Sequence, residues 1–146
     1  MIGYHAAAQE IIDAFHEVPL SNRLELLLEY ADSLPELPER FRDRPELLER
    51  VEECQSPVYL FTEVNSAGLV NVYLTASVEA PTTRGFAAIL SSALNNQSSE
   101  TVLNFSDAFV NQLNLTNLVS PLRIRGLYGM LTRIKRQVRE NLDNAE

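Results

Sequence analysis

Two short runs rich in Val, Leu, Tyr, Phe and Thr constrain the fold more than any other feature of the sequence. They span residues 58–64 and 69–76, and the turn-forming segment Asn65-Ser66-Ala67-Gly68 separates them. This pattern is typical of a β-hairpin. Because side chains alternate between the faces of a strand, Val58, Leu60 and Thr62 should point to one face, and Tyr59, Phe61 and Glu63 to the other. A second layer must therefore cover one face of the hairpin.

Helices are expected before the hairpin. Residues 7–16 carry an apolar repeat that ends at Pro19. Ser21 is positioned to cap a second helix, whose apolar residues recur at helical spacing: Leu24, Leu27, Leu28 and Ala31. Three prolines within eleven residues, Pro35, Pro38 and Pro45, predict an extended or turning connection. It should contain one helical turn over residues 45–50 and a short strand near 50–53.

Helices are also expected after the hairpin. Thr82 or Thr83 is a candidate cap for a helix over residues 84–94, and two short helices are predicted over 98–105 and 106–113. A final helix should run from Ser120-Pro121 to about residue 141, with an apolar stripe of Leu127, Met130, Leu131, Ile134 and Val138. The order of elements predicts an α+β fold, with a small antiparallel sheet packed against several helices in one domain, residues 1–146.

Composition excludes several classes of function. The net charge is -8 and the pI about 4.8, so nucleic acid and anionic membranes are poor partners. The longest apolar run has five residues, 86–90, whereas a membrane-spanning helix needs about 20. With one cysteine, Cys54, and two histidines, His5 and His16, no intrachain disulfide and no Cys/His zinc site is expected. We therefore expect no metal, no cofactor and a reducing cytoplasmic setting.

Common catalytic motifs are absent from the sequence. It contains no G-x-S-x-G element, no P-loop and no dinucleotide-binding fingerprint. The candidate for chemistry is Cys54, which lies between Glu53 and Gln55 in a loop-like stretch directly before the hairpin. A structural cysteine usually sits inside an apolar run, so this position indicates a thiol with a use.

The segment ECQSPVYLF around Cys54 resembles the G-C-Q-S-x-V-W stretch of SufE-type sulfur acceptor proteins. Upstream, the segment LPELP, residues 34–38, resembles the family's L-P-x-L-P. Downstream, residues 79–89 resemble its D-x-x-x-x-x-G stretch and following helix, and LTNLVSPLRIRG, residues 115–126, resembles its L-x-x-x-L-S-P-x-R-x-N-G. The likeness runs from about residue 10 to about residue 140, including the last helix.

This resemblance implies a SufE-like fold and a sulfur carrier that is an accessory protein rather than a stand-alone enzyme. Cys54 would take persulfide sulfur from a PLP-dependent, SufS-like cysteine desulfurase, stimulate that enzyme, and pass the sulfur to a SufBCD-like iron–sulfur scaffold. Gln55 and Ser56 match residues that shape the family's cysteine loop. Glu79 and Arg123 match positions expected to contact the partner.

The sequence departs from the family pattern at four positions. Glu53 replaces the usual Gly, which can adopt a positive φ, and its carboxylate should disfavour a neighbouring thiolate. Tyr59 replaces Trp, Glu79 replaces Asp, and Arg125 replaces Asn. These changes bear on partner choice and transfer rate more than on fold.

Residues 1–63 carry 14 acidic against 5 basic residues, and four of the acids crowd toward Cys54: Glu46, Glu49, Glu52 and Glu53. We expect these acids to face basic residues of the partner, and Arg123 to face an acidic one. We also expect Cys54 to lie in a loop beside the hairpin with its sulfur shielded at rest.

Three alternatives remain open at the level of sequence. The chain could be a binding module or divergent paralogue that activates a desulfurase without carrying sulfur. It could be a stand-alone thiol enzyme, although such enzymes usually have a resolving cysteine or an activating histidine nearby. It could also be a purely structural interaction protein.

Overall fold

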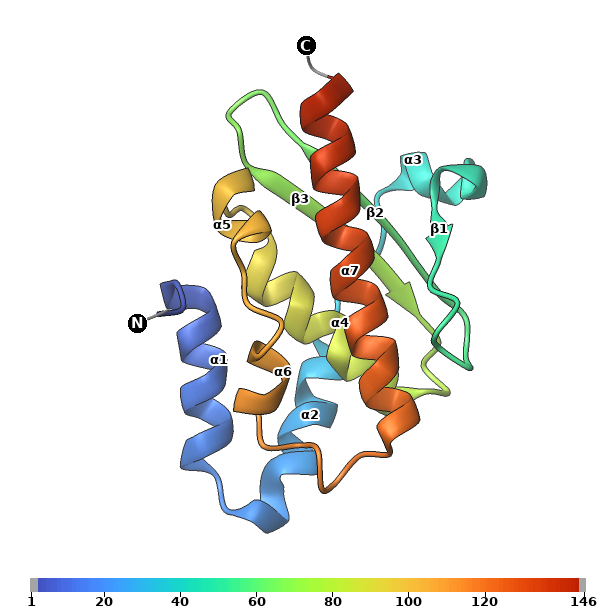
Figure 1. Ribbon diagram of the computed structural model, residues 1–146. Helices are drawn as coiled ribbons and strands as arrows, with labels where there is room; N and C mark the ends of the chain where they lie inside the picture. Colours follow the sequence, from blue (N-terminus) through green and yellow to red (C-terminus); the bar gives the residue numbers. More distant parts are fainter. Residues whose placement is uncertain (1–2, 145–146) are drawn as a thin grey trace.

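The computed structural model describes residues 3–144 (Figure 1). Its sheet has three antiparallel strands in the order β1-β2-β3: β1 (Glu49–Arg50), β2 (Val58–Val64) and β3 (Val70–Ala76). The α-helices are α1 (Ala6–Glu17), α2 (Arg23–Asp32), α3 (Glu39–Arg42), α4 (Pro81–Leu94), α5 (Ser99–Leu103), α6 (Phe109–Gln112) and α7 (Pro121–Asn144). Two 3₁₀ turns are η1 (Leu20–Asn22) and η2 (Pro45–Leu47). The predicted α+β class is confirmed.

The β2–β3 hairpin forms as predicted, in the register that pairs Val58 with Ala76 and Val64 with Val70. Its turn is fixed by Asn65, whose side-chain oxygen accepts hydrogen bonds from the backbone N–H groups of Ala67 and Leu69. Gly68 adopts a φ of 80°, a conformation that residues with a Cβ adopt at a cost. The local sequence therefore sets the position of the turn and with it the register.

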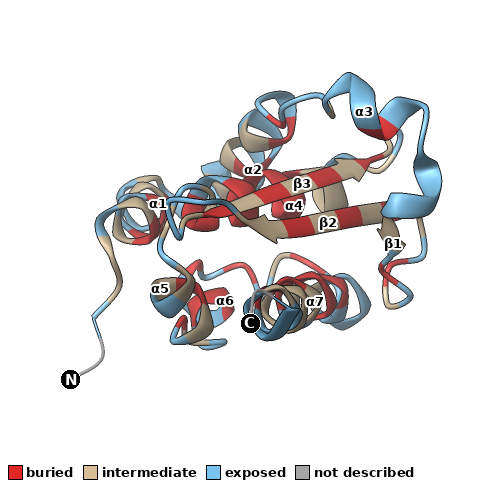
Figure 2. Ribbon diagram, turned by 90° about the horizontal axis from the view of Figure 1, so that it is seen from above, coloured by how far each residue is buried: buried red, intermediate tan, exposed pale blue. Residues whose placement is uncertain are grey.

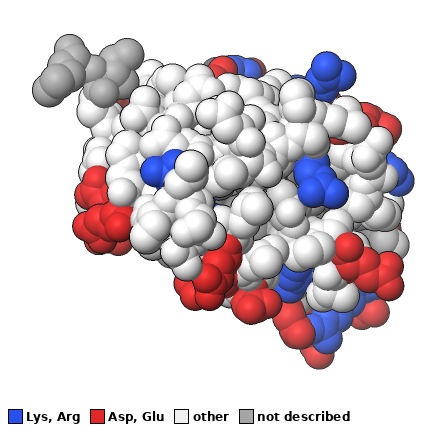
Figure 3. Space-filling view, turned by 90° about the horizontal axis from the view of Figure 1, so that it is seen from below, with Lys and Arg blue, Asp and Glu red and all other residues white. Residues whose placement is uncertain are grey.

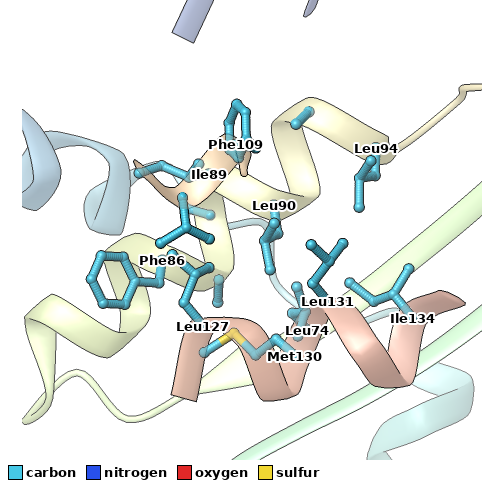
Figure 4. Close-up of a cluster of buried hydrophobic side chains, with 14 of the residues drawn as sticks. Leu74, Phe86, Ile89, Leu90, Leu94, Phe109, Leu127, Met130, Leu131 and Ile134 are labelled. Atoms are coloured by element: carbon cyan, nitrogen blue, oxygen red, sulfur yellow. The ribbon is translucent and has the colours of Figure 1, made fainter. Parts of the chain in front are cut away.

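One face of the hairpin carries the core. Val58, Leu60 and Thr62 of β2 share one face, as predicted, and are buried; this face packs against α7 and α4, as the burial colours of Figure 2 show. Figure 4 shows the apolar side chains that meet between these two helices and β3. The predicted stripe of α7 is buried in full: Leu127, Met130, Leu131, Ile134 and Val138.

The opposite face of the hairpin is covered by the proline-rich connection. Phe41 of α3 is buried against Phe61 and Tyr73, with ring centroids 5.2 and 5.0 Å apart. Arg40 stacks over the Phe41 ring and pairs with Glu63 at 2.8 Å. The connection therefore covers the outer face of the sheet, and it leads directly into β1.

Two details of α2 were predicted wrongly. Leu24 and Leu28, expected to face inward, are 41% and 42% exposed. Helix α4 makes the most extensive contact with this helix, and α1 adds the stacking of Phe15 on Tyr30, so the buried stripe is narrow and consists of Leu27 and Ala31. Ser21 does not cap the helix, because it lies inside the 3₁₀ turn η1.

Most other boundaries differ from the prediction by a few residues. The short strand lies at Glu49–Arg50, slightly before the expected 50–53. Helix α4 begins at Pro81 instead of after a threonine cap, which is a common position for proline because a first-turn N–H has no partner within the helix. The two short helices shrink to α5 and α6, and Ser98 caps α5 by accepting from Thr101 N.

Candidate functional site

Cys54 lies in the loop of residues 51–57, which joins β1 to β2. The backbone closes this loop, since Val51 N donates to Val58 O at 2.9 Å and Cys54 N donates to Val51 O at 3.1 Å. Cys54 is 7% exposed. The prediction that Cys54 lies in a loop beside the hairpin, with its sulfur shielded at rest, is confirmed.

Two glycines of α7 make room for this loop. A Cβ added at Gly126 would lie 2.9 Å from Cys54 Sγ, and one added at Gly129 would lie 2.8 Å from the Glu53 carboxyl carbon. Both distances are far shorter than ordinary contacts, so side chains at these positions would push the loop away. Glycine in a helix interior costs about 1 kcal/mol relative to alanine, and here it allows the Cys54 loop to rest directly on the helix.

The sequence prediction missed this role of α7. The available signal was the pair Gly126 and Gly129 inside a strongly periodic helical pattern. An interior helical glycine indicates either a weak helix or a close approach by another segment. The spacing of three places both glycines on one face, and that face carries the Cys54 loop.

A pocket of about 210 Å³ opens beside Cys54. All five residues proposed from the sequence line it: Cys54, Gln55, Ser56, Glu79 and Arg123. The remaining lining comes from the first turns of α4 and α7: Ala80, Pro81, Thr82, Thr83, Leu122 and Gly126. Three segments that are distant in the sequence therefore meet at the cysteine.

Arg123 lies in the first turn of α7, where its backbone N–H donates to Ser120 O at 3.1 Å and is 3.3 Å from Ser120 Oγ. Its side chain is exposed. The guanidinium forms no hydrogen bond or ion pair with any of residues 3–144. It is therefore available to bind an anion or a carboxylate at the pocket.

The surroundings of Cys54 favour the neutral thiol. Burial raises the pKa of Cys54, and the Glu53 carboxylate raises it further, while Arg133 and Arg50 act in the opposite direction. The expectation that Glu53 disfavours the thiolate is confirmed in direction, although burial is the larger cause. In this conformation the sulfur is both shielded and protonated at neutral pH.

Three of the four acids near Cys54 already have ion-pair partners within the chain, and the expectation that they face basic residues of a partner stays a prediction. Glu46 pairs with Arg44 at 2.5 Å, which holds the pKa of that carboxyl below its usual range. Glu49 accepts a hydrogen bond from Arg136, and this bond is the main cause of its lowered pKa. Sequence counting could not reveal these pairs, because most of the basic partners lie about 80 residues away on α7.

Glu53, the third of these acids, pairs with Arg133 of α7 at 2.6 Å. Its backbone is not in the left-handed region, since the positive φ angles among residues 3–144 belong to Gly68, Asn96 and Asn114. Glu53 in place of the family's usual Gly therefore imposes no backbone strain here. Its effect on the site comes from its side chain.

Neither histidine lies at this pocket. His5 Nε2 is 2.6 Å from Ala93 O, and His16 Nε2 is 2.6 Å from Gln112 O, so both rings attach α1 to neighbouring segments. Among residues 3–144, no group of three or more His, Cys, Asp or Glu side chains is arranged to hold a metal ion. No helix in this part of the chain is long and apolar enough to cross a membrane.

Comparison with known proteins gives consistent matches. The family model described as "SufE: Fe-S metabolism associated domain" matches residues 9–138. Two curated proteins, each named an uncharacterized SufE-like protein, come from Mycobacterium tuberculosis strains CDC 1551 / Oshkosh and H37Rv. Each is 42% identical to this chain over 135 residues, which cover 92% of this chain and 93% of the relative.

A solved structure with the same fold is the solution structure of a hypothetical protein from Thermus thermophilus. It superposes with a TM-score of 0.83 at 34% sequence identity. The superposition covers 97% of this chain and 99% of that one, so the whole arrangement of sheet and helices is shared.

Proposed function

The chain belongs to the SufE family of Fe-S metabolism associated domains, and on that basis we propose that it carries sulfur on Cys54 between a cysteine desulfurase and an iron–sulfur scaffold. The donor would be a PLP-dependent, SufS-like desulfurase, which the chain also stimulates, and the acceptor a SufBCD-like complex. A single cysteine in an acidic chain supports a reducing compartment such as the cytoplasm.

The observation that carries the proposal is the pocket beside Cys54. Cys54, Gln55, Ser56, Glu79 and Arg123 were proposed from separate parts of the sequence, and all of them line it. Its volume of about 210 Å³ compares with about 30 Å³ for one water in the liquid. One additional sulfur atom on Cys54 would therefore fit beside the resting thiol without displacing protein atoms.

Sulfur transfer to Cys54 balances without an external oxidant or reductant. The Cys54 thiolate attacks the terminal sulfur of a persulfide on the desulfurase, as in thiol–disulfide exchange. A new S–S bond forms to Cys54, the S–S bond of the partner breaks, and the partner's thiolate leaves with the bonding electrons. The proton released when Cys54 ionises passes to solvent. The Arg123 guanidinium, with its unused donors, would then stabilise the anionic persulfide or a carboxylate of the partner.

The charges that remain for docking differ from the simple count of acids. Around Cys54, the side chains of Glu52, Glu79, Arg50, Arg123 and Arg125 make no ion pair within residues 3–144. Figure 3 shows the end of the molecule at which α7 begins, where scattered basic groups lie in a broad uncharged surface and acidic groups gather toward an edge. We therefore propose a docking surface of mixed charge, in which these five side chains set specificity and encounter rate.

A stand-alone thiol enzyme receives less support. Such a site usually holds an activating histidine or a resolving cysteine. Here the sole cysteine is Cys54, and both histidines bind backbone carbonyls of other segments. Nothing that lines the pocket lowers the pKa of the buried thiol, so activation would have to accompany docking.

The test is a mass measurement after incubation with a cysteine desulfurase and L-cysteine. We expect the peptide that contains Cys54 to gain the mass of one sulfur atom, and Cys54→Ser to gain none. If the desulfurase itself carries a persulfide and Cys54 gains nothing, the carrier role is wrong. If Cys54→Ser still stimulates the desulfurase fully, the chain is a docking activator instead.

A further inference from the structure

The turn that carries Cys54 is attached to α7 by one ion pair. Glu53 Oε1 lies 2.6 Å from Arg133 Nη1, with the two side chains 33% and 16% exposed. Glu53 rests on Gly129 and Cys54 rests on Gly126, one helical turn apart. Since Glu53 and Cys54 are adjacent in the chain, whatever holds Glu53 on the helix also holds the thiol there.

The Glu53–Arg133 ion pair lacks a directed hydrogen bond, which makes it easier to break. Glu53 Oε1 is a buried atom without a hydrogen-bond partner among residues 3–144, and Arg133 Nη1 donates to Gly129 O at 3.2 Å instead, while Arg133 Nε lies 3.2 Å from Glu49 Oε2. The carboxylate and guanidinium therefore attract each other without a directed hydrogen bond. Directed charge-assisted hydrogen bonds are the stronger kind of pair.

Transfer requires the loop to leave this resting position. Cys54 is 7% exposed, and its sulfur lies against Gly126. A partner's persulfide cannot reach the sulfur from the helix side, and burial keeps the thiol protonated by raising its pKa. Moving Cys54 outward exposes the thiol and brings its pKa back toward the ordinary value, which increases the thiolate fraction, and the same motion separates Glu53 from Arg133.

We propose that Glu53 and Arg133 are positioning residues that hold the Cys54 loop closed on α7, and that release of this ion pair precedes sulfur transfer. The claim that this release serves sulfur transfer rests on the proposed function. The claim that the ion pair holds the loop closed does not. A partner would favour release by offering a cation to Glu53 or an anion to Arg133.

Glu53 and Arg133 have opposite electrostatic effects on the Cys54 thiol. Variants of the two residues therefore distinguish an ion pair that holds the loop closed from charges that only shift the ionisation of the thiol. The Glu53 charge raises the pKa of Cys54 and the Arg133 charge lowers it. If charge alone mattered, Glu53→Gln would speed and Arg133→Gln would slow reaction of the thiol at neutral pH. If the ion pair holds the loop, both variants must expose Cys54 more often, and both must react faster.

The experiment is the rate of reaction of Cys54 with iodoacetamide, followed by intact mass. Cys54 is the sole cysteine, so every added group reports on it. We expect Glu53→Gln and Arg133→Gln each to react about 3- to 10-fold faster than the wild type, as for loss of a partly exposed ion pair that gates a local opening. Glu52→Gln removes a neighbouring acid that forms no ion pair with the described part of the chain, residues 3–144, and it should change the rate less than about twofold.

A second variant keeps the test decisive if Arg133→Gln does not fold or acts through Glu49, which also pairs with Arg133 at 3.2 Å. Glu53→Asp retains the charge beside the thiol but shortens the side chain, so it should also react faster, whereas an effect of charge alone predicts no change. A rate for folded Arg133→Gln at or below that of the wild type, or an unchanged rate for Glu53→Asp, overturns the proposal. Neither measurement uses a desulfurase, so a failed sulfur transfer would leave these outcomes unaffected.

Discussion

Helix α7 holds two neighbouring segments of the chain in different ways. Toward its C-terminal end, Gln137 accepts a hydrogen bond from Thr62 N at 2.7 Å and donates to Glu49 Oε1 at 2.9 Å. Asn141 adds a bond to Thr62 O at 3.1 Å. Near its N-terminal end, the helix offers the Cys54 loop two glycines and one ion pair. We refer to the first region, Glu49, Thr62, Gln137 and Asn141, as the anchor. The two regions meet at Arg133, whose Nε lies 3.2 Å from Glu49 Oε2 and whose Nη1 pairs with Glu53.

The difference shows how one rigid helix can fix a strand and still leave a neighbouring loop able to move. The anchor uses long polar side chains that satisfy backbone groups of β2, and an unsatisfied backbone group is costly. The contact with the loop depends on close fit, which is lost at once when the loop shifts. Regions with few directed bonds have the lowest free energies of local opening.

The largest effect is expected from breaking the anchor. Gln137→Leu leaves the partly buried Thr62 N–H without its acceptor and removes a partner of Glu49. We expect a loss of about 1–3 kcal/mol in the free energy of unfolding, measured by urea denaturation, with the alkylation rate of folded Cys54 nearly unchanged.

The control for this change is Gln112→Leu, the same substitution on the exposed surface of α6, where the hydrogen bonds of Gln112 within residues 3–144 involve its backbone N–H and carbonyl and not its side chain. It should alter the free energy of unfolding by less than about 0.5 kcal/mol. If Gln137→Leu behaves like this control, or speeds alkylation as strongly as Glu53→Gln, the anchor and the loop are not separate regions.

A smaller effect on stability is expected at the glycine beneath the sulfur. Gly126→Ala improves helix propensity by about 1 kcal/mol but brings a Cβ to within 2.9 Å of Cys54 Sγ. Because the two effects oppose each other, we expect little net change in stability and faster alkylation of Cys54. In a Cys54→Ala background, Gly126→Ala should stabilise the protein by about 0.5–1 kcal/mol. Slower alkylation in Gly126→Ala would mean that Sγ does not rest on this glycine.

The two regions also differ in how far the sequence predicted them. The hairpin and the buried stripe of α7 were predicted, because each depends on local periodicity. Five of the residues that line the Cys54 pocket were named through the resemblance to the SufE family, whereas the pocket itself was not predicted. The inward stripe of α2 was half wrong, since Leu24 and Leu28 face solvent. The width of the buried stripe of a helix depends on how many other elements pack against it. The periodicity of the sequence does not reveal how many there are.

The contacts between the Cys54 loop and α7 could not be predicted in the same way. Glu53 meets Arg133, and Glu49 meets Arg136, across more than 75 residues of chain. Charge counting treated these acids as a docking surface because it had no information on distant partners. Only the paired glycines carried a local signal of close approach.

The anchor and the loop should respond to pH in opposite directions. The anchor holds a charged carboxylate, since hydrogen bonding to Arg136 lowers the pKa of Glu49. Its contribution to stability is therefore present above the ordinary carboxyl pKa and is lost as pH falls through the lowered value. The loop holds a neutral thiol, and burial raises the pKa of Cys54 from an ordinary value of 9.0.

The smallest predicted effect follows from that raised pKa. As pH rises, the thiol of the unfolded chain ionises first, so the unfolded state binds fewer protons than the folded state and the free energy of unfolding decreases. The contribution of Cys54 is fully present below its ordinary pKa and is lost as pH rises through the folded value, with a slope of at most about 1.4 kcal/mol per pH unit. Urea unfolding under reducing conditions, from about pH 7 to about pH 10.5, should give a difference between the wild type and Cys54→Ala that is constant at first and then declines. The other titrating groups largely cancel in this difference, because both proteins contain them. A difference that stays constant to the highest pH would mean that the loop accepts the thiolate as readily as water does, and the thiol would then need no release from α7 to become a nucleophile.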